Sequence, residues 1–382
     1  MYLTNLRIKN FRNHLDSWLN FGRGINLLVG NNGQGKTSVL EAISYLCLTK
    51  SFYAGNDSWV LNFNENHFEV EGTFTSEGET EYRTRVLYEE PKKEKFFLIN
   101  GNRVLPLSSV IGKFPLVICS PEYSPITTGG PGERRKFVDF VISQFSSNYF
   151  QTLLEYRRVL RQRNKILFDA KITKVNPQEL LEPWDEQLVK FGTTMMHERI
   201  LFVEEFQPFI QKAYHHLVDD IEDPFIEYMP TIKVPKKLGK IELQELFRNA
   251  LHEQRNDELR TYSTIIGPHL DEFVFKINNF DVRKYASQGQ HKTFLVALKA
   301  AEIFYLKERC NETPIILLDD VFSELDKQRA KNLLSFVGDL SQTFVTTTDP
   351  YLMESILPEE GWNRKFIIQN GAIANHITQV LV

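Results

Sequence analysis

The most informative chemistry in this chain is carried by residues 30–37, which read Gly-Asn-Asn-Gly-Gln-Gly-Lys-Thr. An apolar run precedes this glycine-rich segment and a helix-like stretch follows it. In such a strand-to-helix loop, glycines let backbone N–H groups close on phosphates, and the start of the helix adds partial positive charge. Lys36 would reach the outer phosphates and Thr37 would bind Mg²⁺. We therefore predict a nucleoside triphosphate site made of Gly30, Asn31, Asn32, Gly33, Gln34, Gly35, Lys36, Thr37 and Ser38.

A pair of carboxylates, Asp319 and Asp320, follows the apolar run of residues 314–318. Such a run is typical of a buried parallel strand, and an acid at its carboxyl end can meet the Mg²⁺ held by Thr37. We assign Asp319 as the ligand on the metal side. Asp320 would orient or deprotonate the attacking water, a role that the longer glutamate fills more often.

A third candidate segment, Ser287-Gln288-Gly289-Gln290, stands directly before a helical run. Ser287 would cap that helix and Gly289 would clear space, so the start of the helix is a second possible anion site.

Each of these three motifs also has a simpler interpretation. The glycine-rich segment could be a turn that binds nothing, the aspartate pair a solvated strand end with a helix cap, and residues 287–290 an ordinary helix start. Their occurrence together favours the nucleotide site, because the pair of phosphate loop and acidic strand end is far more specific than either motif alone.

Composition sets the class of protein. With 382 residues, of which 42% are apolar, the chain has room for two domains and a substantial core. Its net charge of −4 gives no general attraction to nucleic acid, so DNA binding would need a local basic surface. The separated cysteines Cys47, Cys119 and Cys310 indicate neither a disulfide framework nor a zinc site. No apolar stretch is long enough to span a membrane and the N-terminus is charged too early for a secretory signal, so we expect a cytoplasmic protein without membrane contact.

The order of strand-like and helical patterns predicts the fold. Strand-like runs fill about the first 115 residues, with a hairpin signal at Asn100-Gly101, and return after Tyr262, where residues 273–277 and 314–318 are two of them. Between them, apolar residues follow a helical period. We predict an α/β fold, a mixed sheet with flanking helices completed by both ends of the chain. Its parts are a head, residues 1–120 and 262–382, and an inserted, mainly helical lobe, residues 121–261.

The predicted lobe carries a basic stripe. Arg157, Arg161 and Lys165 are four residues apart, so on a helix they share one face that suits phosphates. The alternative is a solvated helix face that pairs with acids such as Glu155. We predict a DNA-binding set of Arg134, Arg135, Arg157, Arg158, Arg161, Arg163 and Lys165.

The order of the motifs resembles that of an ABC-type ATPase: phosphate loop, residues 287–290, the aspartate pair, Ser323-Glu324-Leu325-Asp326 and a threonine run that ends before Asp349. Shorter motifs are similar to the RecF family of bacterial recombination-repair proteins over nearly the whole chain. They are Asn10-Phe11-Arg12-Asn13, Gly130-Pro131-Gly132-Glu133-Arg134-Arg135, Arg161-Gln162-Arg163-Asn164 and Gly267-Pro268-His269.

This resemblance implies an ABC-type ATPase head that uses ATP and Mg²⁺ as a switch. Two heads would sandwich the nucleotide, so that Ser287 to Gln290 of one copy face the γ-phosphate held by Lys36 of the other, and dimerisation would require ATP. The resemblance further places Arg12 and Asp326 among the nucleotide-binding residues. It implies a weak ATPase that binds single- and double-stranded DNA at gaps, in a pathway with RecO, RecR and RecA.

The chain departs from the family pattern at three places. Leu270 follows Gly-Pro-His where an arginine is usual, the region of residues 117–122 has no glutamine to place beside the metal, and the terminal switch histidine is replaced by the threonine run ending at Thr348.

Four other classes of protein share part of these motifs. A chromosome-organising ATPase of the SMC or Rad50 type needs long coiled coils, and no sustained heptads separate Lys36 from Asp319. A transporter motor couples to membrane domains, against which the helical insertion and the basic stripe argue. A small-molecule kinase has no use for Ser287 to Gln290, and a pure binding module would never hydrolyse its nucleotide.

Overall fold

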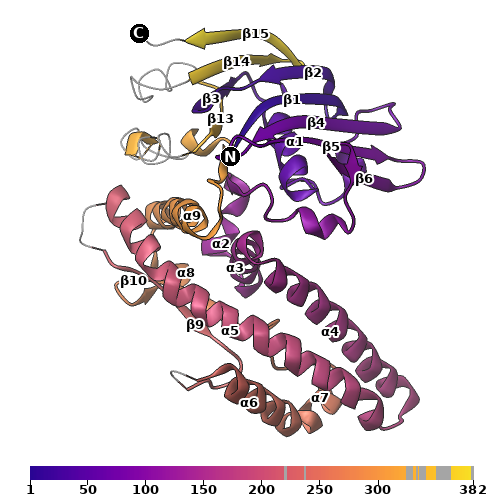
Figure 1. The fold of residues 1–382 in the computed structure, drawn as a ribbon. Coiled ribbons are helices and arrows are strands. Elements are labelled where there is room, and N and C mark those ends of the chain that lie inside the picture. The colour runs from indigo at the N-terminus through magenta and orange to yellow at the C-terminus, as the bar shows by residue number, and fades with distance from the viewer. Residues whose placement is uncertain are drawn as a thin grey trace. The chain divides into compact units, whose positions relative to one another are not determined.

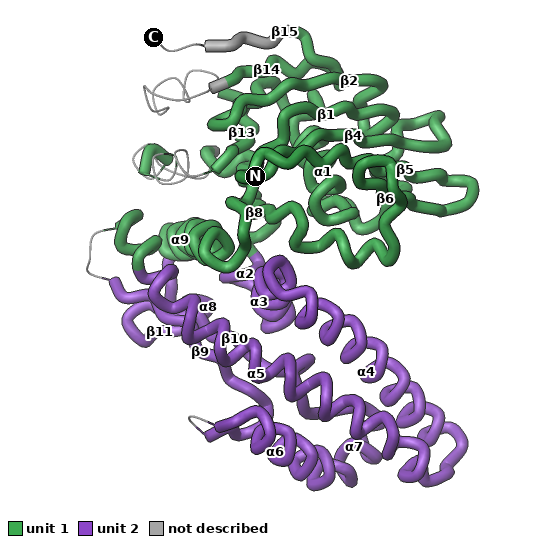
Figure 2. The backbone as a smooth tube through the Cα atoms, in the orientation of Figure 1, with its two compact units in different colours: residues 1–124, 212–221, 288–382 green, residues 125–211, 222–287 purple. Residues whose placement is uncertain are grey.

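The computed structural model describes residues 1–218, 222–235, 238–323, 330–332, 334, 341–349 and 363–379. The chain forms two compact units (Figure 2). The first unit contains residues 1–124, 212–221 and 288–382, and the second contains residues 125–211 and 222–287. In the part of the chain that the structure describes, no helix is both long enough and apolar enough to cross a membrane.

The first unit contains an antiparallel sheet of six strands in the order β2-β1-β4-β5-β6-β7. Their bounds are β1 (Tyr2–Phe11), β2 (His14–Asn20), β4 (His67–Thr75), β5 (Glu81–Glu89), β6 (Glu94–Ile99) and β7 (Asn102–Arg103). The hairpin between β6 and β7 turns at Asn100 and Gly101, both with positive φ, so the turn predicted from this pair is confirmed.

A second six-stranded sheet of this unit positions the nucleotide motifs. Its order is β15-β14-β3-β13-β12-β8, and every pair is parallel except β14 with β15. Its strands are β3 (Ile25–Val29), β8 (Leu116–Cys119), β12 (Ile315–Leu318), β13 (Thr343–Thr347), β14 (Asn363–Gln369) and β15 (Ala372–Gln379). Because β3 and β12 run in the same direction, the glycine-rich loop and the aspartate pair leave the sheet at the same edge.

Two long helices pack in the first unit. Helix α1 (Lys36–Leu48) contacts β1, β4 and β5 of the antiparallel sheet and β13 of the parallel one (Figure 1). Helix α9 (Gln288–Arg309) packs against β8. Both helices bury most of their residues, which agrees with their position inside an α/β core. The described part of the unit also contains short 3-10 turns: η1 (Asp57–Val60), η2 (Leu107–Val110), η3 (Pro121–Tyr123) and η4 (Val321–Ser323). The predicted α/β class with a helical region is confirmed.

The second unit is mainly helical. It contains α2 (Pro125–Thr128), α3 (Pro131–Phe145), α4 (Ser147–Thr173), most of α5 (Gln178–Leu217), α6 (Lys240–Glu253), α7 (Arg255–Thr261) and α8 (Val282–Tyr285). A small antiparallel sheet accompanies them, in the order β11-β10-β9, from β9 (Pro224–Met229), β10 (Glu272–Ile277) and β11 (Phe280–Asp281).

Strand β10 corrects one sequence prediction. Residues 273–277 were expected in the head sheet, but β10 pairs with β9 in the second unit, so that placement is wrong. Buried and partly exposed residues alternate along β10, as is typical of a strand with one solvated face, whereas β12 is buried at every position. The division between the units accordingly falls between Ser287 and Gln288, not between Thr261 and Tyr262.

Candidate functional site

The glycine-rich loop connects β3 to α1 by a path that needs glycine. Gly35 has φ +108°, in the left-handed region, and a Cβ there would lie 2.7 Å from Asn13 Oδ1. A Cβ on Gly30 would lie 2.4 Å from the carbonyl oxygen of Ile368 in β14. Packing on two sides thus fixes the loop in front of the α1 N-terminus, where backbone N–H groups can bind an anion.

Lys36 lies across this loop. Its Nζ donates to the carbonyl oxygens of Gly30 at 2.6 Å and Asn31 at 2.9 Å. Partial burial lowers the pKa of Lys36, while the nearby carboxylates of Asp320 and Asp319 oppose that shift. The ammonium group is therefore held at the mouth of the loop, beside two acids.

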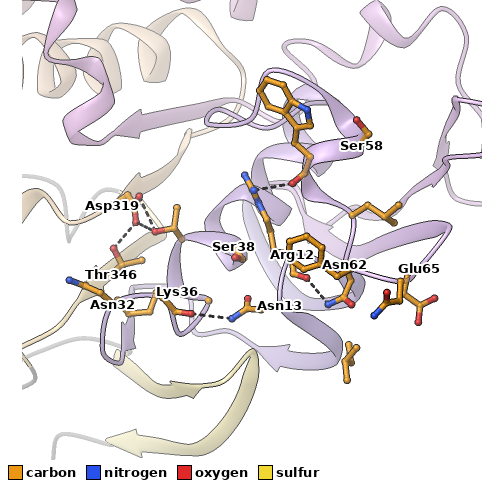
Figure 3. A pocket seen from close by; sticks show the side chains of 18 of the residues that line it. Arg12, Asn13, Asn32, Lys36, Ser38, Ser58, Asn62, Glu65, Asp319 and Thr346 are labelled. Atoms are coloured by element: carbon orange, nitrogen blue, oxygen red, sulfur yellow. Dashed lines mark hydrogen bonds between the residues drawn. The ribbon is translucent and has the colours of Figure 1, made fainter.

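Thr37, Asp319 and Thr346 meet beside the loop. Thr37 Oγ1 donates to Asp319 Oδ1 at 2.9 Å, and Thr346 Oγ1 donates to the same oxygen at 2.8 Å (Figure 3). Burial raises the pKa of Asp319, and the hydrogen bonds from Thr346 and Thr37 oppose that shift. The structure thus brings together the two residues predicted to hold the metal, which lie 282 positions apart in the chain.

This donor set fits Mg²⁺. Hydroxyl and carboxylate oxygens are the ligands that Mg²⁺ prefers, and it usually binds through one or two carboxylates together with phosphates and water. Among the described residues, no group of three or more histidine, cysteine, aspartate or glutamate side chains gathers as a metal site would. Thr37 and Asp319 supply two such oxygens, and phosphate and water would supply the remaining ligands.

Asp320 occupies the next position in an unusual conformation. Its φ is +50°, and its backbone N–H donates to Thr346 Oγ1 at 2.9 Å. The residue is exposed and lines the cavity described next.

A cavity of about 1100 Å³ opens in front of the loop. This volume accommodates a nucleoside triphosphate. One side of it is formed by the loop, α1 and the acids; the other is formed by the segment from Ser58 to Glu65, including the apolar side chains of Trp59, Leu61 and Phe63. The sequence prediction missed this second wall.

Arg12 also lines the cavity. Its guanidinium makes a bidentate ion pair with Glu41 of α1, at 2.9 Å for each contact, and donates to the Trp59 carbonyl oxygen at 3.0 Å. Arg12 therefore connects the phosphate-loop helix with the apolar wall.

The segment predicted to face a second copy lies elsewhere. Ser287, Gln288 and Gly289 are exposed, Gln290 is half-buried, and none of the four is among the described residues that line the cavity. Helix α9 begins at Gln288. Asp326 lies outside the described residues.

The predicted basic stripe is partly present. Arg157, Arg161 and Lys165 are exposed on α4, and none of these three side chains forms an ion pair with another described residue. Arg158 is exposed as well and pairs with Glu155 at 2.8 Å.

Three of the predicted DNA-binding arginines are instead part of the structure of the second unit. Arg163 is completely buried and pairs with Asp185 at 2.8 Å and with Glu258. Arg134 is buried against Glu272 at 3.0 Å. Arg135 is half-buried and donates to the Asp271 carbonyl oxygen at 2.7 Å. The prediction is therefore wrong for Arg163 and Arg134, because a buried and paired guanidinium cannot reach a DNA phosphate.

The burial pattern of α4 contains the signal that separates these arginines. Tyr149, Leu153, Tyr156 and Val159 are buried at helical spacing, and Arg163 continues this series. Position within an apolar stripe thus distinguishes a buried arginine from its exposed neighbours.

Comparison with known protein families agrees with these observations. The family model described as RecF/RecN/SMC N terminal domain matches residues 2–363. The DNA replication and repair protein RecF of Chloroherpeton thalassium is 43% identical over 352 residues, which cover 91% of this chain and 95% of that protein. The RecF protein of Salinibacter ruber is 40% identical over 351 residues, which cover 91% of this chain and 85% of that protein.

Solved structures are similar over the same length. The recombination mediator protein RecF–ATPrS in the RecFOR pathway has a TM-score of 0.88 and 34% identity, and covers 97% of each chain. The RecF–ATP structure has the same TM-score and 32% identity, and covers 99% of this chain and 98% of that one. An Smc head bound to the C-terminal winged-helix domain of ScpA has a TM-score of 0.58 at 14% identity, which is a likeness of fold. The chain belongs to the RecF family of DNA replication and repair proteins.

Proposed function

We propose that the chain is an ATP-dependent DNA-binding protein of recombination repair and replication, which dimerises on ATP, binds single- and double-stranded DNA at gaps and hydrolyses ATP slowly. The observation that carries this proposal is the meeting of Thr37, Asp319 and Thr346 beside the phosphate loop. It is supported by the RecF structure, similar to this chain, that was solved as RecF–ATP.

The nucleotide phosphates would lie against the backbone of residues 30–38, at the N-terminus of α1. Lys36 would exchange its contacts with the Gly30 and Asn31 carbonyls for contacts with the outer phosphates. Thr37 and Asp319 would hold Mg²⁺, which supplies neutralisation of phosphate charge when it is bound. The wall around Trp59 would cover the rest of the nucleotide.

Asp320 would orient the attacking water. It lines the same cavity as Lys36, and its backbone N–H donates a hydrogen bond to Thr346 Oγ1. Aspartate reaches less far than glutamate, so the water is held less well and hydrolysis is expected to be slow. A slow ATPase suits a switch, because the ATP state then lasts long enough to act.

Dimerisation would complete the site. Ser287 to Gln290 begin a helix at an exposed position and do not line the cavity of their own copy within the described part of the chain. The N-terminus of α9 from a second copy would supply the missing anion contacts to the γ-phosphate. A triphosphate that bridges two half-sites stabilises only the closed pair, and hydrolysis removes the bridge.

DNA would bind through the exposed stripe of Arg157, Arg161 and Lys165, together with Arg158. Contacts of this kind go to phosphates, so binding would depend little on sequence and strongly on salt. Family membership supports RecO, RecR and RecA as partners and the cytoplasm as the place of action.

Nucleotide binding and turnover by three variants test the proposal. Lys36→Met should weaken ATP binding by about a hundredfold or more, because the charge facing the phosphates is lost. Asp320→Asn should keep binding but lengthen the lifetime of bound ATP. Lys113→Met, at an exposed position outside the cavity, is the matched control for Lys36.

Two outcomes would point to other functions. An unchanged ATP lifetime in Asp320→Asn would indicate a binding module that does not hydrolyse. Full turnover by Ser287→Arg would favour a small-molecule kinase, which has no use for that segment.

A further inference from the structure

Two turns that are far apart in the chain pack against the phosphate loop. One is the β1–β2 turn, which leads into His14, and the other is the β14–β15 turn at Asn370 and Gly371. Gly371 N donates to the Gln34 carbonyl oxygen at 2.9 Å, and Asn370 N donates to Gln34 Oε1 at 2.7 Å. A Cβ on Gly371 would lie 1.9 Å from the Asn13 carbonyl oxygen, so the two turns touch closely.

His14 and Ser17 connect these parts by a chain of hydrogen bonds. The His14 ring is completely buried, with Nε2 3.1 Å from the Gly35 carbonyl oxygen and Nδ1 2.9 Å from Ser17 Oγ. Ser17 Oγ donates to the Gly371 carbonyl oxygen at 3.1 Å. This series of hydrogen bonds thus connects Gly35, the last glycine of the phosphate loop, with the C-terminal hairpin.

The hydrogens available to this chain depend on the charge of His14. Both ends are carbonyl oxygens, which only accept, so each of the three contacts needs its own hydrogen. The serine hydroxyl supplies one, and a neutral imidazole supplies one more, which leaves one of the three contacts unmade. The doubly protonated imidazolium supplies two, and all three contacts are then made.

His269, in the second unit, shows the contrasting arrangement. Its Nδ1 lies 2.7 Å from the Tyr156 hydroxyl and its Nε2 lies 3.3 Å from the Thr264 carbonyl oxygen. A neutral ring satisfies both, because the tyrosine donates to one nitrogen while the other donates to the carbonyl. The requirement for a second proton is therefore a feature of His14 and its partners.

No charged side chain among the described residues sets the protonation state of His14, so a bound ligand can change it. Burial lowers the pKa of His14 and the Gly35 carbonyl opposes that shift; no charged side chain of the described residues contributes to it. The groups that face the ring are the hydroxyl of Ser17 in β2 and the carbonyl of Gly35 at the start of α1. Arg12, two residues before His14, pairs with Glu41, and Lys36, next to Gly35, donates to Gly30 and Asn31.

We propose that nucleotide binding at the phosphate loop takes up a proton at His14, which completes the hydrogen bonds from Gly35 through Ser17 to Gly371 and fixes the C-terminal hairpin to the loop. The triphosphate brings negative charge next to Gly35, and this charge favours the imidazolium. The inference rests on the proposed nucleotide site, and it adds that occupancy is coupled to pH and to the C-terminal hairpin.

The direction of the coupling follows from linkage. Binding raises the His14 pKa, so between the values of the free and the bound protein the complex holds one more proton. In that range affinity for ATP should rise as pH falls, by up to about tenfold per pH unit. The gain disappears once pH exceeds the pKa of the bound state.

Calorimetric titration with ATP in two buffers of different ionisation enthalpy measures the uptake directly, from about pH 6 to about pH 8. His14→Gln keeps a donor for Gly35 but cannot titrate in this range. Ser17→Ala removes the acceptor for Nδ1, so the ring remains neutral while most of the loop contacts stay. His252→Gln, at an exposed position in the second unit, is the matched control and also accounts for protons taken up by ATP itself.

We expect the wild type and His252→Gln to take up more protons per ATP than His14→Gln or Ser17→Ala. The affinity for ATP should also depend more steeply on pH in the wild type and His252→Gln than in the other two variants. Equal uptake in the wild type, His14→Gln and Ser17→Ala would overturn the coupling while leaving the nucleotide site intact. No ATP binding by the wild type at any pH would remove the proposed function, and the inference with it.

Discussion

Two threonine hydroxyls converge on one carboxylate beside the phosphate loop. Thr37 and Thr346 both donate to Asp319 Oδ1, and Thr346 Oγ1 also accepts the backbone N–H of Asp320. Thr346 thus orients the acid on the metal side and the acid on the water side at the same time. Its position in β13, next to β12, lets one side chain reach both.

Replacing Thr346 with valine tests this role. Valine keeps the shape but removes one of the two hydroxyls that donate to Asp319 Oδ1 and the acceptor of the Asp320 N–H, at a cost of about 1–3 kcal/mol. We expect ATP turnover to fall by roughly tenfold to a hundredfold. Thr348→Val, two residues along and exposed, is the control in the same steady-state assay. Equal turnover of the two variants would contradict the role.

His269 supports a prediction about stability and pH. Burial lowers the pKa of His269 to about 4 in the folded protein, against about 6.5 in the unfolded chain. The unfolded chain therefore binds more protons between these values, and stability is lost as pH falls from about 6.5 to about 4, by about 3 kcal/mol. Denaturant unfolding across this range should show that the free energy of unfolding of His269→Gln falls less than that of the wild type. His252→Gln should lose as much stability as the wild type. The same loss in His269→Gln would count against a neutral, buried His269.

Local patterns in the sequence predict part of the site. The glycine-lysine spacing identifies Lys36 and Thr37, and the acid at a strand end identifies Asp319, because both signals are local. The threonine run that ends at Thr348 includes Thr346, but it does not predict its contacts with both aspartates, which arise from the parallel register that places Val345 beside Leu318. The sequence does not predict Trp59 and Phe63 as lining residues either, because they lie in and just after a short 3-10 turn without a regular apolar period.

At the scale of elements, α4 separates two uses of arginine. Its buried face carries Arg163, which joins α4 to Asp185 of α5 and Glu258 of α7. Its exposed face carries Arg157, Arg161 and Lys165. One helix therefore both holds the second unit together and presents cations to solvent.

Paired substitutions on α4 distinguish these faces. Arg163→Met should destabilise the fold by about 3–5 kcal/mol, because it leaves the buried carboxylate of Glu258 without its ion pair and removes one of the two arginines that pair with Asp185. Arg161→Met should leave the unfolding midpoint nearly unchanged and weaken DNA binding at low salt. Replacing Arg157, Arg161 and Lys165 together with glutamine should lower the dependence of DNA affinity on salt by roughly 0.7–0.9 per lost phosphate contact. A triple variant with wild-type affinity and salt dependence would exclude this face as the DNA site.

The sequence predicts which segments form strands better than it predicts which sheet each strand joins. The apolar run at β3 predicts a strand before the phosphate loop and the run at β12 predicts a buried parallel strand, and the structure confirms both. The run at β10 is equally clear as a strand, but strand character alone does not say which sheet it joins. Its alternating burial, set by pairing with β9, became apparent only with the fold.

Within the described residues, the nucleotide site of a single chain lacks the helix start that the proposed dimer would supply. Phosphate loop, metal-side residues and cavity wall all belong to the first unit, whereas the helix start at Ser287 to Gln290 does not line this cavity within the described residues. The chain order places these parts far apart, and neither spacing nor composition reveals that a second copy would have to join them. Two copies and two ATP molecules would form two complete sites.

Light scattering of the purified chain with ATP, with ADP and without nucleotide measures this assembly most directly, using Lys36→Met and Ser287→Arg as variants. We predict a mass of 44.6 kDa in ADP and about twice that in ATP for the wild type, with both variants remaining at one chain in ATP. A wild-type mass of one chain in saturating ATP, or an equal dimer in ADP, would contradict the claim that ATP joins two half-sites.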